Sequence, residues 1–197
     1  MAYFGFAPYV PVAEKREKAK KTIEKLKKKD PSISPVIIEG RKIALTWWGK
    51  AWNDNLESYS DYSNRIGRGR SYVRNGAVLD LKISKGKIAA LVQGSGSKPY
   101  KVNITIEPLN KKLLKELSKD CLGKIDTFEE LMEGKFPKDL AELFTTKGRG
   151  LFPSPDEITL NCSCPDWAVM CKHVAAVLYG VGARLDKEPE LFLHLEI

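Results

Sequence analysis

Four residues that can ligate a metal fall within twelve positions in the C-terminal part of the sequence. Cys162 and Cys164 are separated by one residue, and after six further residues Cys171 and His173 repeat that spacing. Three thiolates and one imidazole are a common donor set for tetrahedral zinc. All four positions would be filled by protein, which leaves no place for water or substrate. The spacing therefore predicts one structural zinc ion rather than a catalytic one.

The residues around the cluster indicate how it could close around one ion. Residues 157–161 have the composition of a strand, and side chains two apart in a strand project to one face. Cys162 and Cys164 can then reach the same ion. From Met170 onward apolar residues recur at helical spacing, so Cys171 and His173 are expected at the start of a helix. The positive end of that helix would favour the thiolate form of Cys171.

Three other chemistries each account for part of the cluster. A disulfide between Cys162 and Cys164 would close a small strained ring and leave Cys171 and His173 unexplained. An iron–sulfur centre usually takes four cysteines, or two cysteines and two histidines. A cysteine nucleophile with His173 as base lacks a third residue to orient the base.

If the zinc module folds on its metal, replacing Cys171 by alanine should unfold the last forty residues and leave much of the remaining chain folded.

The rest of the 197-residue chain predicts helices on both sides of a β region. Residues 14–29 are rich in lysine with one narrow apolar stripe, which predicts an exposed basic helix. Residues 36–39 and 43–46 predict two short β segments around Gly40. A stripe of Trp48, Trp52 and Leu56 at helical spacing predicts a helix that faces the core. Further helices are expected over 109–117 and 127–144.

The clearest β pattern lies in the middle of the chain. Asn75-Gly76 is a strong signal for a hairpin turn, and Val102, Ile104 and Ile106 alternate along a later segment. The expected fold class is α+β: an antiparallel β meander with flanking helices, plus a small C-terminal strand-knuckle-helix zinc module. The four strands of the meander are expected at 71–74, 78–83, 87–93 and 100–107. The expected division of the chain is a basic N-terminal helical segment (1–35), an α+β body (36–146) and the zinc module with C-terminal helices (147–197).

The chain carries a formal net charge of +8, which favours polyanionic partners and nucleic acid first among them. No apolar run is long enough to cross a bilayer, and the N-terminus lacks the pattern of a secretory signal. Clustered cysteines are typical of metal sites in a reducing compartment. We therefore expect a soluble cytoplasmic protein with no membrane partner.

Arginine residues gather around a glycine-bearing stretch in the first half of the chain. If residues 71–74 form a strand, Arg70, Tyr72 and Arg74 share one face, where guanidinium groups would contact phosphates and the ring would stack on a base. The alternative is a solvated face on which arginine stems cover the ring. The basic helix could add contacts to the nucleic-acid backbone. The candidate nucleic-acid contacts are Arg65, Arg68, Arg70, Tyr72, Arg74, Lys147 and Arg149.

The pattern C-x-C, six residues, C-x-H resembles the SWIM zinc finger at every ligand position. Residues 48–52, 67–76 and 150–155 are similar to the stand-alone SWIM proteins of bacteria and archaea. The resemblance implies zinc ligation by Cys162, Cys164, Cys171 and His173, binding to DNA or protein, and association with helicase-like ATPases. It supplies no catalytic residues, and the middle region offers no paired carboxylates, nucleophile elbow or phosphate loop. We therefore expect neither an enzyme nor a small-molecule substrate.

These observations favour a zinc-stabilised accessory protein that binds nucleic acid, DNA or RNA, with little sequence specificity and works with a helicase-like ATPase. The alternative is a protein–protein interaction adaptor that docks on a helicase or on a ribonucleoprotein such as the ribosome. The sequence leaves open which of these partners is the primary one.

Overall fold

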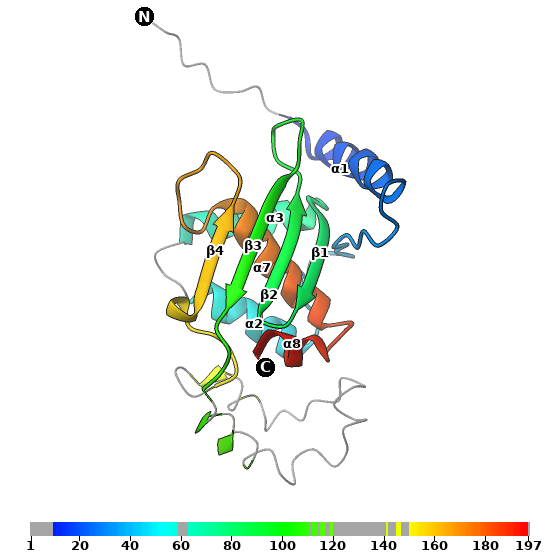
Figure 1. Ribbon diagram of the computed structural model, residues 1–197. Coiled ribbons are helices and arrows are strands. Elements are labelled where there is room, and N and C mark those ends of the chain that lie inside the picture. The colour runs from blue at the N-terminus through cyan, green and yellow to red at the C-terminus, as the bar shows by residue number, and fades with distance from the viewer. Residues whose placement is uncertain are drawn as a thin grey trace, which may run out of the picture.

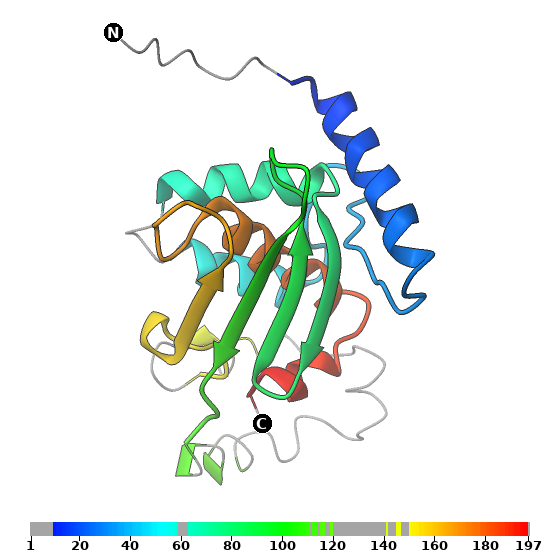
Figure 2. The same cartoon turned by 45° about the horizontal axis from the view of Figure 1, so that its top comes forward.

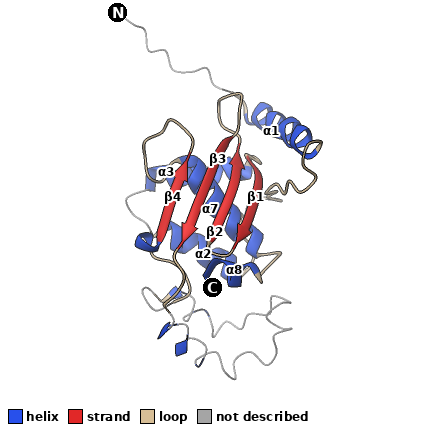
Figure 3. Ribbon diagram, in the orientation of Figure 1, coloured by secondary structure: helices blue, strands red, loops and turns tan. Residues whose placement is uncertain are grey.

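The computed structural model describes residues 10–58, 63–110, 112–113, 115–116, 119, 141, 145–146 and 150–196 (Figure 1). Helices cover one face of a four-stranded sheet, and a further helix stands at the sheet's edge (Figures 2 and 3). The strands are all antiparallel and lie in the order β1-β2-β3-β4. The elements in chain order are α1 (Val12–Lys27), α2 (Trp47–Glu57), α3 (Ser63–Arg74), β1 (Val78–Ser84), β2 (Lys87–Val92), β3 (Tyr100–Ile106), the short 3-10 helix η3 (Pro155–Glu157), β4 (Ile158–Cys162), α7 (Lys172–Leu185) and α8 (Leu191–Glu196).

The sheet has one packed face and one exposed face. Along β3, Val102, Ile104 and Ile106 are buried, while the residues between them are exposed. An antiparallel sheet with one solvated face produces this alternation. The α+β class and the central strands are therefore confirmed. The fourth strand is not the expected 71–74 segment, however, but β4, which pairs with β3 from Ile158 to Cys162.

The segment 71–74 was expected to be a strand and is instead the last turn of α3. Its neighbours Asn75 and Gly76 end the helix rather than turn a hairpin. Gly76 has a φ of +68°, its N–H donates to Val73 O (3.0 Å), and the N–H of Ala77 donates to Tyr72 O (3.1 Å). This is the Schellman arrangement that closes many helices. A hairpin and a helix end both need a residue with positive φ, so Asn-Gly by itself does not distinguish them.

Residues 30–46 contain no strand, so the two β segments expected around Gly40 are also wrong. The chain there nevertheless runs beside β1. The N–H of Val36 donates to Val78 O (3.1 Å), and the N–H of Leu81 donates to Ser34 O (3.0 Å). These bonds satisfy part of the β1 edge without a regular ladder. Such cover protects an edge strand from pairing with another chain.

Helix α7 lies at the centre of the molecule, between the sheet and helices α2 and α3. Nearly every side chain from His173 to Gly182 is buried, as expected for a helix surrounded by protein on all sides. Glycines allow the close helix crossings. A Cβ at Gly69 of α3 would lie 2.5 Å from the Ala175 Cβ, and one at Gly49 of α2 would lie 2.7 Å from the Gly182 carbonyl oxygen.

The tryptophans of α2 hold this helix against α7, which confirms their expected place in the core. Both are buried, and their indole groups donate hydrogen bonds of 2.9 Å, from Trp48 to Leu185 O and from Trp52 to Leu178 O. The Asp186 carboxylate, just beyond α7, accepts from the N–H and the hydroxyl of Thr46 at the start of α2. The two helices are thus fixed by polar bonds as well as by packing.

Helix α1 is the expected exposed basic helix and lies beside the β1 edge of the sheet (Figure 2). Ala19 is its one buried residue. The Thr22 hydroxyl donates to Gln93 Oε1 (3.1 Å), and Lys18 Nζ donates to Gly96 O (2.9 Å). These contacts attach α1 to the loop after β2.

The zinc segment and the body share one hydrophobic core. Strand β4 and helix α7 belong to residues 147–197, yet they pack with Val36, Trp52 and Val102 from residues 36–146. Of the helix expected over 109–117, residues 112–113 and 115–116 are helical, and the one expected over 127–144 lies outside the described residues, apart from position 141. Within the described ranges, no helix combines the length and the apolar character needed to cross a membrane.

Replacing Gly69 by alanine should lower the free energy of unfolding by about 1–3 kcal/mol, because the new methyl group overpacks the crossing of α3 and α7. Gly67 is on the same helix, and a Cβ there meets nothing within 4 Å. Gly67→Ala should therefore raise stability by about 0.5–1 kcal/mol through helix propensity. Urea unfolding followed by circular dichroism measures both changes. Equal effects of the two substitutions would contradict the close crossing.

Candidate metal centre

The four predicted ligands come together between the end of β4 and the start of α7. Cys162 is the last residue of β4, and Cys164 follows it by two positions. Cys171 is the N-cap of α7, with extended backbone (φ −76°, ψ 169°), and His173 lies in the first turn. Their ligand atoms all lie within 4.8 Å of one another. The expected strand, knuckle and helix entry are confirmed.

The distances fit a tetrahedral zinc ion held through the Nδ1 atom of His173. This atom lies 3.7 Å from Cys171 Sγ and 3.9 Å from Cys162 Sγ. Zinc–sulfur and zinc–nitrogen bonds at tetrahedral angles place sulfur and nitrogen about 3.6 Å apart. The donor set therefore needs only a small contraction to bind one zinc ion. Because the protein supplies all four ligands, the centre is structural.

Packing rather than hydrogen bonding orients the His173 ring. The side chain is 2% exposed, and its Nε2 atom has no hydrogen-bond partner among the described residues. Its ring centre lies 4.7 Å from that of Tyr100 and 5.3 Å from that of Tyr72. Gly94 closes the remaining side, where a Cβ would lie 3.2 Å from Nε2. Metal-bound histidines usually donate their second N–H to an acceptor, and here two tyrosine rings and a glycine take that place.

The three thiols have different acidities. Hydrogen bonding from the Cys162 thiol lowers the pKa of Cys171 to about 3, and further bonds from His173 and from the Val174 N–H act in the same direction. The backbone contribution is the one expected at a helix start. The shared hydrogen bond, followed by burial, raises the pKa of Cys162, and burial raises the pKa of Cys164. Without metal, one thiolate is therefore present at neutral pH.

The knuckle, residues 165–170 between the two ligand pairs, is attached to α3. Arg65 of α3 forms an ion pair with Asp166 at 2.7 Å, and both side chains are mostly buried. The second Asp166 oxygen accepts from the N–H of Ala168 (3.3 Å). Arg65, expected to contact nucleic acid, has its charge paired here. Two apolar side chains of the knuckle point to solvent, with Trp167 93% exposed and Val169 62% exposed.

Arg70 and Tyr72 do not share a face, because residues two apart on a helix point in nearly opposite directions. The Arg70 Nε donates to the Tyr179 hydroxyl (2.7 Å), and its guanidinium also pairs with Glu57 at 2.7 Å. The Tyr179 hydroxyl in turn donates to Glu57 (2.7 Å). This network joins α2, α3 and α7. Arg70 therefore has a structural partner set of its own.

The remaining candidate nucleic-acid contacts are two exposed arginines, one half-buried tyrosine and two residues outside the described ranges. Arg68 and Arg74 are exposed on α3. Tyr72 is half-buried, burial raises its pKa, and Lys172 Nζ lies 6.0 Å from the centre of its ring. Lys147 and Arg149 lie outside the described residues. Lys172 stands between two ligands in the sequence and was identifiable on that ground, whereas the contacts of Tyr100 and Gly94 with His173 depend on the tertiary structure.

A strand, a knuckle and a helix start that converge on three cysteines and one histidine define a structural zinc finger. Residues 148–181, which contain all four ligands, match the family model described as the SWIM zinc finger. Residues 148–181 thus carry a SWIM zinc finger, and its cluster fits one structural zinc ion.

A relative from Mycobacterium tuberculosis, the uncharacterised protein Rv2102, is 38% identical over 148 residues. The alignment covers 75% of this chain and 53% of the relative, so the chain spans about half of that protein's length. No solved structure matches the chain.

Zinc binding near neutral pH should release about two protons, one from Cys162 and one from Cys164, because both thiols must ionise to ligate the metal. Cys171 contributes none, since its lowered pKa leaves it already charged. The affinity should therefore fall as the pH falls. Calorimetric titration in buffers of different ionisation enthalpy counts the protons. An enthalpy independent of the buffer would contradict the assignment.

Replacing Cys171 by alanine should unfold the whole described body together and not the last forty residues alone, because α7 and β4 are part of the common core. A structural zinc site contributes on the order of 10 kcal/mol, comparable to the stability of an entire domain. Tryptophan fluorescence from α2 and circular dichroism should change together in urea. Cys121→Ala, which alters the cysteine outside the cluster, is the control. A separate early transition confined to residues 158–197 would contradict this prediction.

Proposed function

We propose that this protein is a zinc-stabilised nucleic-acid-binding accessory protein with little sequence specificity, which has no catalytic site of its own and works with a helicase-like ATPase. The observation that carries the proposal is the placement of charge. Residues 12–29 contain nine basic and three acidic side chains, a net +6 out of +8 for the whole chain. Most of the excess charge is therefore concentrated on the exposed helix α1 and the two lysines that follow it, at one edge of the sheet (Figure 1).

The side of α1 next to the loop 94–97 carries lysines and two glutamates. Lys18, Lys21 and Lys25 border a shallow groove between α1 and this loop together with Glu14 and Glu17, and Lys21 forms an exposed ion pair with Glu17 at 3.5 Å. Lys21 and Lys25 are exposed, as a contact to a nucleic-acid backbone requires. Binding through such groups neutralises phosphates, does not depend on base sequence and weakens as salt rises.

Basic and aromatic groups continue from α1 toward the zinc centre. Tyr72 packs on the ligand His173, with Lys172 above its ring and Arg68 one turn earlier on α3. An aromatic ring between cations suits a single strand, whose bases are free to stack. The charges of Arg65 and Arg70 are already paired with Asp166 and Glu57.

We expect little preference for base sequence, because the helices of the core are packed against protein and α1 carries mainly lysines. The buried faces of α2 and α3 are packed against α7, and α7 is packed against the sheet. Helix α1 presents mainly lysines, which act as point charges toward phosphates and do not read base edges in the paired manner of arginine or asparagine. The partnership with a helicase-like ATPase rests on the resemblance to stand-alone SWIM proteins. The thiol-rich zinc site suits a reducing compartment such as the cytoplasm.

The exposed knuckle favours one alternative, a protein–protein interaction adaptor for a helicase or a ribonucleoprotein. Trp167 and Val169, two residues apart in the knuckle, are large apolar side chains that are both mostly exposed to solvent. Tryptophan is also enriched among the residues that dominate protein interfaces. An apolar interface of this kind would respond weakly to salt.

Binding to labelled single-stranded DNA, duplex DNA and RNA should be tight at low salt and fall steeply as salt rises. Changing Lys21 and Lys25 to glutamine should weaken binding and reduce the log–log salt slope by up to about 1.4 on a single strand, because each lost phosphate contact accounts for about 0.7. Fluorescence anisotropy across a salt series measures both quantities.

The matched control is the double change of Lys85 and Lys87 to glutamine. Both are exposed, and they lie in and beside the β1–β2 turn, at the opposite end of the sheet from α1 (Figure 1). This pair should leave the slope unchanged. Absence of binding to all three nucleic acids at low salt would reject the proposal and favour the adaptor.

A further inference from the structure

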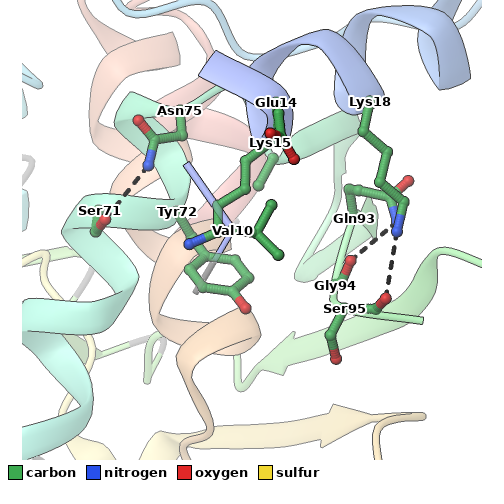
Figure 4. A pocket seen from close by; sticks show the side chains of 11 residues that line it. Val10, Glu14, Lys15, Lys18, Ser71, Tyr72, Asn75, Gln93, Gly94 and Ser95 are labelled. Carbon is green, nitrogen blue, oxygen red and sulfur yellow. Dashed lines mark hydrogen bonds between the residues drawn. The ribbon is translucent and has the colours of Figure 1, made fainter. Parts of the chain in front are cut away.

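A cavity of about 370 Å³ lies between α1, α3 and the loop that follows β2 (Figure 4). Its volume falls in the range of small-molecule sites, about 300–1,000 Å³. Val10 and the first turn of α1 form one wall, Tyr72 and its neighbours on α3 form another, and residues 93–95 form the third. The cavity is separate from the metal cluster, although it adjoins it.

Hydrogen bonds hold the walls of the cavity in place. The Thr22 hydroxyl donates to Gln93 Oε1 (3.1 Å), and Gln93 Nε2 donates to Gly94 O (3.0 Å) and Gly96 O (3.2 Å). From α1, Lys18 Nζ donates to Ser95 O (3.2 Å) and to Gly96 O. Helix and loop are therefore already joined before any ligand enters, which lowers the ordering cost of binding.

The groups around the cavity are of three kinds, and each suits one part of a nucleotide. The Tyr72 ring offers an aromatic surface for stacking. Ser71 and Asn75, which lie side by side in Figure 4, supply a hydroxyl and a carboxamide of the kind that bonds the edge of a base. Lys15 extends from α1 toward the same space and can face a phosphate.

An acidic side chain at the cavity favours a nucleotide over other anions. Glu14 also borders the cavity, so a ligand that is anionic throughout, such as an acidic peptide, would meet a like charge. A nucleotide has a neutral base and carries its charge at one end. Its base can occupy the interior while its phosphate lies on the Lys15 side.

We propose that this cavity holds one unstacked base of a single-stranded nucleic acid, with Tyr72 as the stacking ring, Asn75 at the base edge and Lys15 at the adjoining phosphate. The inference rests on the proposed function, since it assigns a subsite to the strand that α1 attracts. It adds that a single strand is preferred over a duplex, whose bases are stacked and paired and cannot enter.

The zinc centre supports two walls of this subsite. Tyr72 and Gly94 both pack against His173. Loss of the metal would unfold these walls together with the rest of the described body, whereas the lysines of α1 would keep their charge. Base binding should therefore depend on zinc more strongly than the phosphate attraction does.

The test compares Tyr72→Leu with Tyr72→Phe in the full-length, zinc-loaded protein. With a single-stranded oligonucleotide, Tyr72→Leu should weaken binding about 5- to 150-fold, the loss of one stacked base, while Tyr72→Phe stays within about twofold. Binding to a duplex of the same length should not change in either variant. Zinc content and thermal melting verify that both variants are folded.

A second variant fills the cavity without altering Tyr72. Ser71 is exposed at the rim, so Ser71→Trp should block the cavity and reproduce the single-strand loss. Gly67→Trp is the matched control, because it adds the same bulk to the same helix at a position open to solvent. If wild type binds nucleic acid and both Ser71→Trp and Tyr72→Leu bind single strands equally well, the subsite is rejected while the proposed function stands.

A mononucleotide series distinguishes a base that belongs to a nucleic-acid strand from the base of a free nucleotide. Adenosine and uridine monophosphates are titrated into the wild-type protein and the Ser71→Trp variant by calorimetry. Weaker binding by the mononucleotides than by the oligonucleotide supports the strand assignment. A mononucleotide that binds more tightly than the strand, and is lost in Ser71→Trp, overturns that assignment in favour of a free nucleotide. Failure of every nucleic acid to bind rejects the proposed function itself.

Discussion

Helix α7 is buried on all sides, and its packing organises the whole fold. The helix packs against α2, α3 and all four strands, and two of its neighbours approach it through glycines at positions 49 and 69. Its N-terminal end carries Cys171 and His173, so the helix that organises the core also presents half of the zinc ligands. Metal binding and core formation are consequently one process: the ion orients the start of α7, and the packing of α7 positions the ligands.

Helix α3 illustrates how a basic segment is divided between structure and surface. Its inner face packs on α7 through Ile66, Gly69 and Val73. On either side of that face, Arg65 and Arg70 are joined to acidic partners that lie 101 and 13 residues away in the chain, Asp166 and Glu57. A guanidinium held in a partly buried pair costs more to remove from its partner than an exposed lysine does from water. The exposed lysines of α1 are therefore better placed to meet a polyanion than Arg65 and Arg70 of α3.

The metal centre also connects the two surfaces to which partners are assigned. The knuckle presents Trp167 to solvent on one side, while His173 supports Tyr72 and Gly94 on the other. A rigid zinc site between them would keep the two surfaces in a fixed relative position, whichever nucleic-acid strand or protein partner is bound. In this respect the zinc finger is an integral part of the fold, since its strand β4 completes the sheet that the body begins.

The sequence by itself determined the features that depend on local spacing. The four ligands, the strands from 78 to 106, the exposed helix α1 and the tryptophan face of α2 all follow from periods of two or about 3.6 residues, or from metal-ligand spacing. Other features became visible only in the tertiary structure. Asn75-Gly76 ends a helix and does not turn a hairpin, and β4 is the strand that joins β3. The acids that pair with Arg65 and Arg70, and the cavity between α1 and α3, also depend on the folded arrangement. The physical reason is that these outcomes depend on partners distant in the chain, and a local pattern records the conformation that a residue can adopt but not the surface against which it packs.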